Sequence, residues 1–245
     1  MTERLGFYER VLSSLLEQGL LARDARVLVV AGGEVDREAF AALGFTDVTV
    51  TNLSEAGDER QDAEALTYPD DSFDVAVISA ALHHCASPHR ALLELYRVAR
   101  RGLVAFEARD SALMRLALRL HVVDEYELTA VADNGFASGG VRNTAVPNYV
   151  YRWTEREVEK TIASAAPQRR HRFVWFRELE LPVSVLELSG KGRWRLAAQP
   201  LKLLTKMLPK QANLFAFAVF REGLQPWMRD EETPDAAQIR RRLGQ

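Results

Sequence analysis

The sequence predicts an α/β fold in which a mostly parallel sheet carries helices on both faces. Short apolar or β-branched runs alternate with amphipathic segments in units of roughly 25 residues, and strands joined in this way form parallel sheets with right-handed crossovers. The first apolar run ends in a glycine turn, the place where such a sheet lets a ligand approach its backbone. With 47% hydrophobic and 27% charged residues, the 245-residue chain has a globular composition.

The N-terminal elements follow from spacing and residue type. Between residues 2 and 21 apolar side chains recur three and four positions apart, which predicts an amphipathic helix. The apolar run at 26–30 predicts a strand, the glycines after it a tight turn, and residues 36–43 a short helix. Residues 47–51 are largely β-branched and predict the second strand.

Two further strands flank a helix in the middle of the chain. Residues 73–79 and 103–106 are mainly apolar runs of strand length. Between them, Ser87 and Pro88 fit the cap and first turn of a helix, and Gly102 is expected to end it. The alternation of strand and helix therefore continues to residue 106.

The region from residue 110 to 153 breaks this rhythm. It is rich in Asn, Gly and charged residues and is too long for a plain crossover, so we expect a cap insertion over a site. Regular structure resumes with a capping box at 154–157, which opens a helix to about residue 165. Strands are then expected at 171–176 and 214–220.

A basic segment separates the last two strands. Residues 189–221 contain seven cations and no acid beside an apolar stripe, which predicts a basic helical insertion at about 180–212. We expect it to cover the sheet edge or to form a homodimer contact; attachment to an anionic membrane surface is the less favoured alternative. The prediction is one domain over residues 1–225, followed by a polar C-terminal tail at 226–245.

Charge and cysteine content narrow the classes of partner and compartment. The net charge of −2 provides no bulk cationic field, so no nucleic-acid partner is expected. The single cysteine, Cys85, cannot form an intramolecular disulfide and suits a reducing interior. The first ten residues lack an apolar signal core, and no stretch approaches ~18 uncharged apolar residues. These features predict a cytoplasmic location.

Two segments in the middle of the chain carry a family resemblance. They are Gln-Asp-Ala-Glu-Ala-Leu-Thr-Tyr-Pro-Asp-Asp-Ser-Phe-Asp-Val at 61–75 and Ala-Leu-His-His-Cys-Ala-Ser-Pro-His-Arg-Ala-Leu-Leu-Glu-Leu-Tyr-Arg-Val-Ala-Arg at 81–100. In this order they are similar to the middle of class I S-adenosylmethionine-dependent methyltransferases, most closely to the small-molecule branch often called type 11. The resemblance covers roughly residues 25 to 110. It implies the Rossmann-like class I methyltransferase fold, a seven-stranded sheet and S-adenosylmethionine as cofactor.

The resemblance also implies cofactor-binding positions. The glycine turn would lie under the methionine part of the cofactor, Asn52 would face the ribose where the family usually has an acid, and Asp62 would accept from the adenine amine. An amide can both donate and accept hydrogen bonds. The backbone around Ser79 would border the sulfonium. The full implied set is Ala31, Gly32, Gly33, Asn52, Leu53, Asp62, Ala63, Ser79 and Ala80.

Two positions depart from the family pattern. The turn reads Ala-Gly-Gly-Glu-Val at 31–35 where the family prefers Gly-x-Gly-x-Gly, and Val29 replaces an acid inside the first strand. The alternative to an enzyme is therefore a non-catalytic Rossmann-like protein that uses the cofactor fold to bind a small molecule or a partner.

Catalytic candidates lie just beyond the third and fourth expected strands. Methyl transfer to a hydroxyl needs a base for its proton, and histidine is the natural base near neutral pH. His84 is our preferred general base; its neighbour His83 is expected to pack or cap, and Glu107 could orient a histidine. A divalent metal held by His84, Glu107 and Asp110 is the alternative for these residues; no ligand spacing requires one, so we predict none.

The cap supplies the residues expected to bind the acceptor. Asn, Arg and Tyr side chains in glycine-rich loops suit a polyhydroxylated ligand, because polar groups there meet a flat aromatic face. The predicted function is O-methylation of a hydroxyl on a sugar-like or natural-product small molecule. The predicted acceptor-binding residues are Arg109, Arg142, Asn143, Tyr149 and Arg152.

Overall fold

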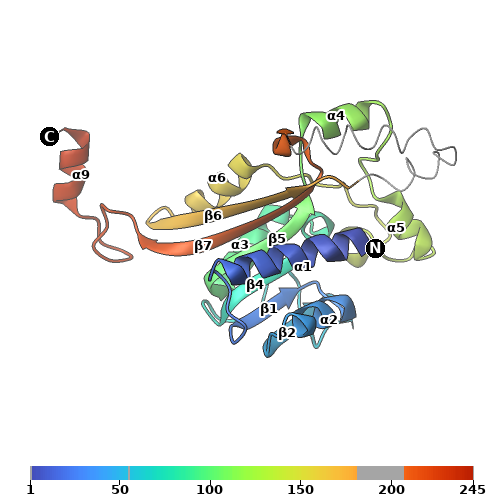
Figure 1. Cartoon of the computed structure of the whole chain (residues 1–245), viewed down its shortest axis with the longest axis horizontal. Helices are drawn as coiled ribbons and strands as arrows, with labels where there is room; N and C mark the ends of the chain where they lie inside the picture. Colours follow the sequence, from blue (N-terminus) through green and yellow to red (C-terminus); the bar gives the residue numbers. More distant parts are fainter. Residues whose placement is uncertain (1, 55, 181–206, 245) are drawn as a thin grey trace.

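The architecture is a single seven-stranded sheet with helices on both faces, as predicted (Figure 1). The computed structural model describes residues 2–54, 56–180 and 207–244. Strand order is β3-β2-β1-β4-β5-β7-β6; the neighbours from β3 to β5 pair in parallel, and β7 runs antiparallel to both β5 and β6. The strands are β1 (Arg26–Val30), β2 (Asp47–Asn52), β3 (Glu59–Arg60), β4 (Phe73–Ser79), β5 (Ala99–Ala108), β6 (Arg169–Glu178) and β7 (Leu214–Leu224).

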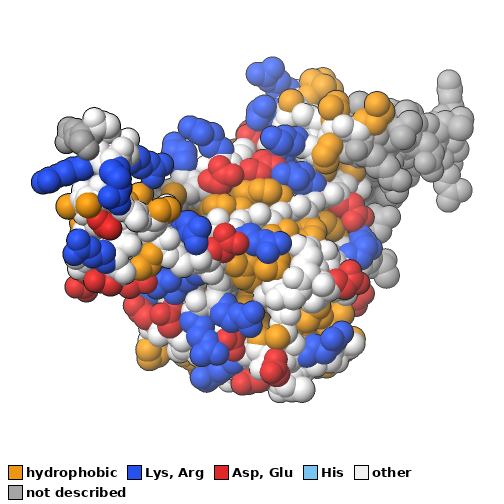
Figure 2. All heavy atoms as spheres, turned by 60° about the vertical axis from the view of Figure 1, so that its left-hand side comes forward, with side chains coloured by type: hydrophobic (Ala, Val, Ile, Leu, Met, Phe, Trp, Pro, Cys, Tyr) orange, Lys and Arg blue, Asp and Glu red, His pale blue; other side chains and the backbone are white. Residues whose placement is uncertain are grey.

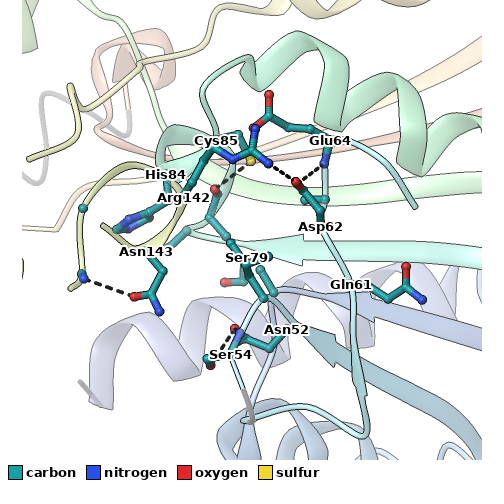
Figure 3. Close-up of a pocket in the computed structure, with 17 residues that line it drawn as sticks. Asn52, Ser54, Gln61, Asp62, Glu64, Ser79, His84, Cys85, Arg142 and Asn143 are labelled. Carbon is teal, nitrogen blue, oxygen red and sulfur yellow. Dashed lines mark hydrogen bonds and ion pairs between the residues drawn. The ribbon is translucent and has the colours of Figure 1, made fainter. Parts of the chain in front are cut away.

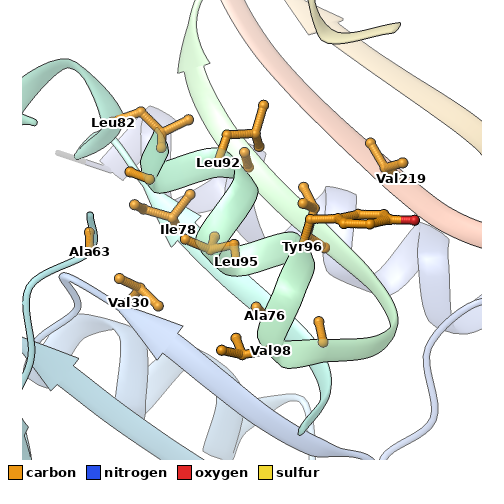
Figure 4. Close-up of a cluster of buried hydrophobic side chains, with 14 of the residues drawn as sticks. Val30, Ala63, Ala76, Ile78, Leu82, Leu92, Leu95, Tyr96, Val98 and Val219 are labelled. Atoms are coloured by element: carbon orange, nitrogen blue, oxygen red, sulfur yellow. The ribbon is translucent and has the colours of Figure 1, made fainter. Parts of the chain in front are cut away.

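The helices divide between the two faces of the sheet. The principal ones are α1 (Thr2–Glu17), α2 (Glu34–Ala42), α3 (Pro88–Val98), α4 (Ala112–Arg119), α5 (Leu128–Asp133), α6 (Glu155–Ala165) and α9 (Ala236–Leu243). Helices α1 and α2 bury side chains such as Leu12 and Phe40 against one face, in a cluster with Val27 and Val29 of β1. On the other face α3 and α6 pack against the sheet, and Figure 4 shows Leu92 and Leu95 of α3 in that second cluster.

Within the described ranges, short 3-10 turns occur at three points. They are η1 (Leu82–His84) after β4, η2 (Val141–Asn143) in the cap and η3 (Pro209–Gln211) before β7. The predicted capping box is present in part, because the Thr154 hydroxyl accepts from the Glu157 backbone N–H at 3.2 Å. Strand β3 has only two residues, and no periodic pattern in the sequence marked it.

The assignment of Gly102 as a helix stop is wrong. Helix α3 ends at Val98, and β5 begins at the next residue. Gly102 lies inside β5, where an added Cβ would come within 2.2 Å of the Val219 carbonyl oxygen of the neighbouring strand. The glycine is therefore needed for close approach of β7, a strand more than 100 positions away in sequence.

The C-terminal tail contains a helix that the sequence analysis did not place. Helix α9 begins after Asp235, whose side chain accepts from the Gln238 N–H, and it has no buried residues. Figure 1 shows it beyond the far end of the β6–β7 pair. On the face shown in Figure 2, Lys and Arg side chains lie among Asp and Glu rather than in a block of one sign.

Most of the basic insertion predicted at 180–212 lies outside the described residues, so its edge-cover, homodimer and membrane-surface roles stay predictions. Among the helices in the described ranges, none combines the length and apolar character needed to cross a membrane.

Candidate functional site

A pocket of about 270 Å³ opens at the carboxyl ends of β1, β2 and β4 (Figure 3). This edge is where parallel α/β sheets bind ligands. The sheet contributes Ala31 after β1, Asn52 at the end of β2 and Ser79 at the end of β4. The cap contributes its η2 turn, through Arg142 and Asn143. The pocket therefore has one wall from the sheet and one from residues of the segment predicted to form a cap.

The glycine turn is shaped by close packing behind it. Ala31 has a positive φ of 56°, and a Cβ on Gly32 would lie 2.6 Å from a Val29 methyl carbon. The Gly33 N–H donates to the Asp36 carboxylate at 2.9 Å, which starts α2. A Cβ on Gly33 would meet nothing within 4 Å. Gly32 is thus required by the protein itself, whereas Gly33 leaves open space beside the turn.

Asn52 is already engaged by its own surroundings. Its Nδ2 donates to the Gly32 carbonyl at 2.8 Å, and its Oδ1 accepts from both the N–H and the hydroxyl of Ser54. The amide thereby ties the end of β2 to the glycine turn. Because the oxygen already accepts two hydrogen bonds, the amide can offer a ligand only its second N–H.

Asp62 meets a side chain from the cap rather than open solvent. Its Oδ2 lies 2.5 Å from the Arg142 guanidinium, and its Oδ1 accepts from the Glu64 N–H. Arg142 and Asn143 both have positive φ values, 51° and 58°, and the Asn143 side chain accepts from the Gly139 N–H. Arg142, predicted to bind the acceptor, is thus placed at the pocket that holds the predicted adenine-binding residue.

His83 is held between two carboxylates. Its Nδ1 lies 2.8 Å from Glu107 Oε2, and its Nε2 lies 3.5 Å from Glu127 Oε2. Glu107 is buried, and its Oε1 accepts from the backbone N–H groups of Ala81 and Leu82. Burial lowers the pKa of His83, but the two carboxylates outweigh it and raise the pKa to about 10. His83 is therefore protonated at neutral pH and has no lone pair with which to act as a base.

Among the described residues, His84 has one carboxylate neighbour, Glu127. Its Nε2 lies 3.2 Å from Glu127 Oε2, and its side chain is 31% exposed. It lines the pocket, as Figure 3 shows. Hydrogen bonds from His83 and His84 hold the pKa of Glu127 well below its usual range, despite the opposing effect of burial. Sequence reasoning missed Glu127; the only signal was the acidic pair Asp124–Glu125 just before it.

A second cavity of about 290 Å³ adjoins the first. Ser79 and Ala80 line both, so the two cavities meet at the end of β4. The second cavity is bounded by the groups of the carboxylate–histidine cluster, His83, Glu107 and Glu127, and by aromatic and aliphatic side chains. These side chains are Phe7, Tyr8, Phe106, Met114, Val123, Val150, Leu214 and Phe215.

Of the remaining predicted acceptor residues, Tyr149 and Arg152 line a third cavity of about 790 Å³, and Arg109 does not line it. Arg152 also lines the second cavity, although its guanidinium already donates to the Val150 and Asp124 carbonyls. Tyr149 is 48% exposed and packs edge-on against Tyr126 away from the first two cavities. Arg109 lines neither of the first two cavities. It is buried, and its Nη2 donates to both carboxylate oxygens of Glu155. The structure therefore gives Arg109 a part in joining β5 to α6.

The side chains considered for a metal are not brought together. Asp110 pairs with Arg115 at 2.9 Å, and Glu107 faces His83 rather than His84. Cys85 also lines the first pocket, where burial raises the pKa of its thiol to about 12. The thiol is thus neutral near pH 7, which agrees with a packing role.

Comparison with known proteins gives a consistent pattern. Residues 31–106, about a third of the chain, match the sequence model of the methyltransferase domain Methyltransf_11. Over 60 residues the chain is 42% identical to the ubiquinone/menaquinone biosynthesis C-methyltransferase UbiE of Hydrogenovibrio crunogenus; this stretch is 24% of the present chain and 20% of that protein.

Solved structures extend the likeness to most of the chain. An S-adenosylmethionine-dependent methyltransferase from Mesorhizobium loti aligns with a TM-score of 0.50 at 17% identity, over 83% of this chain and 95% of that one. The PH0226 protein from Pyrococcus horikoshii aligns with a TM-score of 0.52 at 13% identity, over 90% and 91%. At such identities the likeness is one of fold.

Proposed function

On the premise that the chain has the class I methyltransferase fold, we propose that it is an S-adenosylmethionine-dependent methyltransferase acting on a small-molecule acceptor. One observation carries the proposal. Of the nine residues that the resemblance assigned to the cofactor, all but Gly32 and Gly33 line the same pocket at the carboxyl ends of the strands. Those two glycines form the turn behind Ala31.

The chemistry of the pocket fits this cofactor. When bound, S-adenosylmethionine supplies a methyl group on a positively charged sulfur. Asp62 offers a carboxylate oxygen to the adenine amine once Arg142 moves aside, and Asn52 offers one N–H to the ribose. Ser79 and Ala80, where the two cavities meet, would border the reacting carbon. The second cavity would then hold the body of the acceptor, with its reacting hydroxyl at the Ser79–Ala80 junction, next to the first pocket that His84 lines.

For a hydroxyl acceptor, His84 is the proposed general base. It stands at the junction of the cluster with the first pocket, and Glu127 would stabilise the imidazolium formed when it takes the proton. Protonation of His83 supports this choice between the two histidines. The aromatic lining of the second cavity favours a natural-product acceptor with a flat apolar body over a highly hydroxylated sugar.

A non-catalytic binding protein is the second candidate. It is favoured by the Arg142–Asp62 pair, which occupies the carboxylate that would read adenine. The two candidates differ in whether the cofactor and its demethylated product bind at all.

Calorimetric titration with S-adenosylmethionine and with S-adenosylhomocysteine separates these candidates. We expect both compounds to bind. Asp62→Ala should weaken the binding of both by about tenfold to a hundredfold, because leaving the adenine amine without a hydrogen-bond acceptor costs about 1 to 3 kcal/mol. The matched control is Asp47→Ala, an exposed acid at the opposite end of β2, which should leave both affinities unchanged. No binding to wild-type protein would favour the second candidate.

A further inference from the structure

We propose that Glu127 is a positioning residue for His84, supplied by the cap, so that the base is complete only when the cap lies against the sheet edge. The inference rests on the proposed function, which gives the base a hydroxyl to act on. It adds to that function a named residue and a dependence of the base on the cap.

The position of Glu127 is fixed by both its backbone and its side chain. Its N–H donates to the Asn148 carbonyl at 3.0 Å, and its Oε2 accepts from Asn148 Nδ2 at 3.1 Å. Asn148 itself is fully buried. Next to this pair, the Val150 N–H donates to the Glu125 carbonyl at 2.8 Å. Two segments of the cap, around residues 125–127 and 148–150, therefore hold the carboxylate in place.

From this position one carboxylate oxygen meets both imidazoles. Glu127 Oε2 lies 3.5 Å from His83 Nε2 and 3.2 Å from His84 Nε2. One ring nitrogen of each histidine and a carboxylate oxygen of Glu127 all lie within 4.8 Å of one another. The histidine rings are tilted by 39°, with centroids 4.6 Å apart. The cap thus places one carboxylate oxygen beside both histidines.

The sheet anchors the other end of the cluster. Glu107 of β5 is fixed by the N–H groups of Ala81 and Leu82, and in turn it binds His83 Nδ1. His83 therefore uses one nitrogen for the sheet and points the other at Glu127. In the order Glu107, His83, Glu127, His84, each carboxylate has an imidazole beside it, so the buried Glu107 and the partly exposed Glu127 are both paired.

This geometry selects one tautomer of His84. With Nε2 facing a carboxylate, the ring carries its proton on Nε2 and leaves the lone pair on Nδ1. In transfer, Nδ1 takes the hydroxyl proton while the acceptor oxygen bonds to the methyl carbon. The carbon–sulfur bond breaks and the sulfur keeps the electron pair. The resulting imidazolium donates to Glu127. A carboxylate thus orients the ring beforehand and stabilises its charge afterwards.

The test is nitrogen-15 NMR of histidine-labelled full-length protein, read for the tautomer of His84. Wild-type protein should show the Nε2–H tautomer of His84 in at least about tenfold excess, as expected for a ring held by a carboxylate. Glu127→Gln should reduce that excess severalfold, and Glu127→Asp should restore part of it. Glu125→Gln, which removes an exposed neighbouring acid, should leave it unchanged. An Nδ1–H tautomer in wild-type protein, or an equal effect of the Glu125 variant, would overturn the proposal.

Two further measurements separate this proposal from the function on which it rests. The affinity of Glu127→Gln for S-adenosylhomocysteine should stay within about twofold of wild type, because Glu127 lines the second cavity and not the first. Absence of S-adenosylhomocysteine binding in wild-type protein would contradict the proposed function. The NMR measurement of the His84 tautomer would still test whether Glu127 orients the ring. Thermal denaturation checks that each variant folds. If Glu127→Gln does not fold, Asn148→Ser is used in its place. This variant removes the hydrogen bond from Asn148 to the Glu127 carboxylate, and we expect it to reduce the excess of the Nε2–H tautomer of His84.

Discussion

The two walls of the site are built in different ways. The sheet wall consists of residues at or just after the carboxyl ends of strands, namely Ala31, Asn52, Asp62, Ser79 and Ala80. The cap wall consists of loop residues held by one another, namely Glu127, Gly139, Gly140, Arg142 and Asn143. Strands β1 and β4 behind the sheet wall are almost fully buried, whereas side chains near the cap wall, such as Phe136, are 72% exposed.

This difference predicts which property a substitution in each wall will change. A change in the closely packed sheet cannot be absorbed locally, so it should alter the free energy of unfolding. A change in the cap can be absorbed by loop movement, so it should alter ligand binding or the orientation of a side chain. Three variants test this contrast.

The largest expected effect is that of Gly102→Ala in the sheet. The new Cβ would lie 2.2 Å from the Val219 carbonyl oxygen, and two paired strands would have to separate to make room. We expect a loss of about 3 kcal/mol in the free energy of unfolding, at the upper end for overpacking. Chemical denaturation measures it. A loss below about 1 kcal/mol would show that the sheet relaxes as easily as the cap.

A smaller effect on the sheet should follow from pH. Burial, with the charges of Arg221 and Arg169, lowers the pKa of His171 in β6 to about 4, and its Nε2 faces the Tyr96 hydroxyl at 2.8 Å. The folded protein therefore keeps His171 neutral at a pH where the unfolded chain, with an ordinary pKa near 6.5, binds a proton. The contribution of neutral His171 to the free energy of unfolding is therefore complete above about pH 6.5 and is lost as the pH falls towards about 4.

Comparison with His171→Gln isolates this contribution, because glutamine can accept from Tyr96 but does not titrate. Between pH 7 and pH 4.5 we expect wild-type protein to lose about 1 to 2 kcal/mol more than the variant, a value reduced from the full linkage energy because His171 is only half-buried. Parallel stability curves for the two proteins would contradict the assignment.

The smallest expected change in unfolding free energy belongs to the cap. In Gly140→Ala the new Cβ would lie only 1.8 Å from the Val146 carbonyl oxygen, a closer contact than that at Gly102. Because the surrounding residues are largely exposed loop, we expect less than about 1 kcal/mol of lost stability. Gly140 lines the first pocket, so affinity for S-adenosylhomocysteine should fall by about tenfold. A stability loss equal to that of Gly102→Ala would remove the distinction between the walls.

The sheet wall was largely predictable because its signals are local. A few neighbouring residues are enough to predict the strand at 26–30, the turn after it and the strand at 73–79. The errors on the sheet came from distant pairing. Gly102 was read as a helix stop, yet its role depends on β7, and the two-residue β3 exists only through its pairing with the end of β2.

The cap wall shows the opposite balance. Its presence was predicted from length and composition, but the contacts of its residues were not. Arg142, predicted to bind the acceptor, forms an ion pair with Asp62, 80 positions away in sequence, and no local pattern indicated this pair. Arg109 was assigned to the acceptor and is instead bound by Glu155. Glu127 was not identified, although it contacts both histidines.

The sequence by itself determined the fold class, the family resemblance and the strand ends that carry the candidate cofactor residues. Periodicity, caps and turns act over a few residues, and parallel strands place their carboxyl ends at one edge. Only the tertiary structure decided which histidine is held as a cation, which carboxylate faces the other, and which charges the cap brings to the pocket. Those outcomes depend on burial and on distances between side chains far apart in sequence, and no local pattern encodes them.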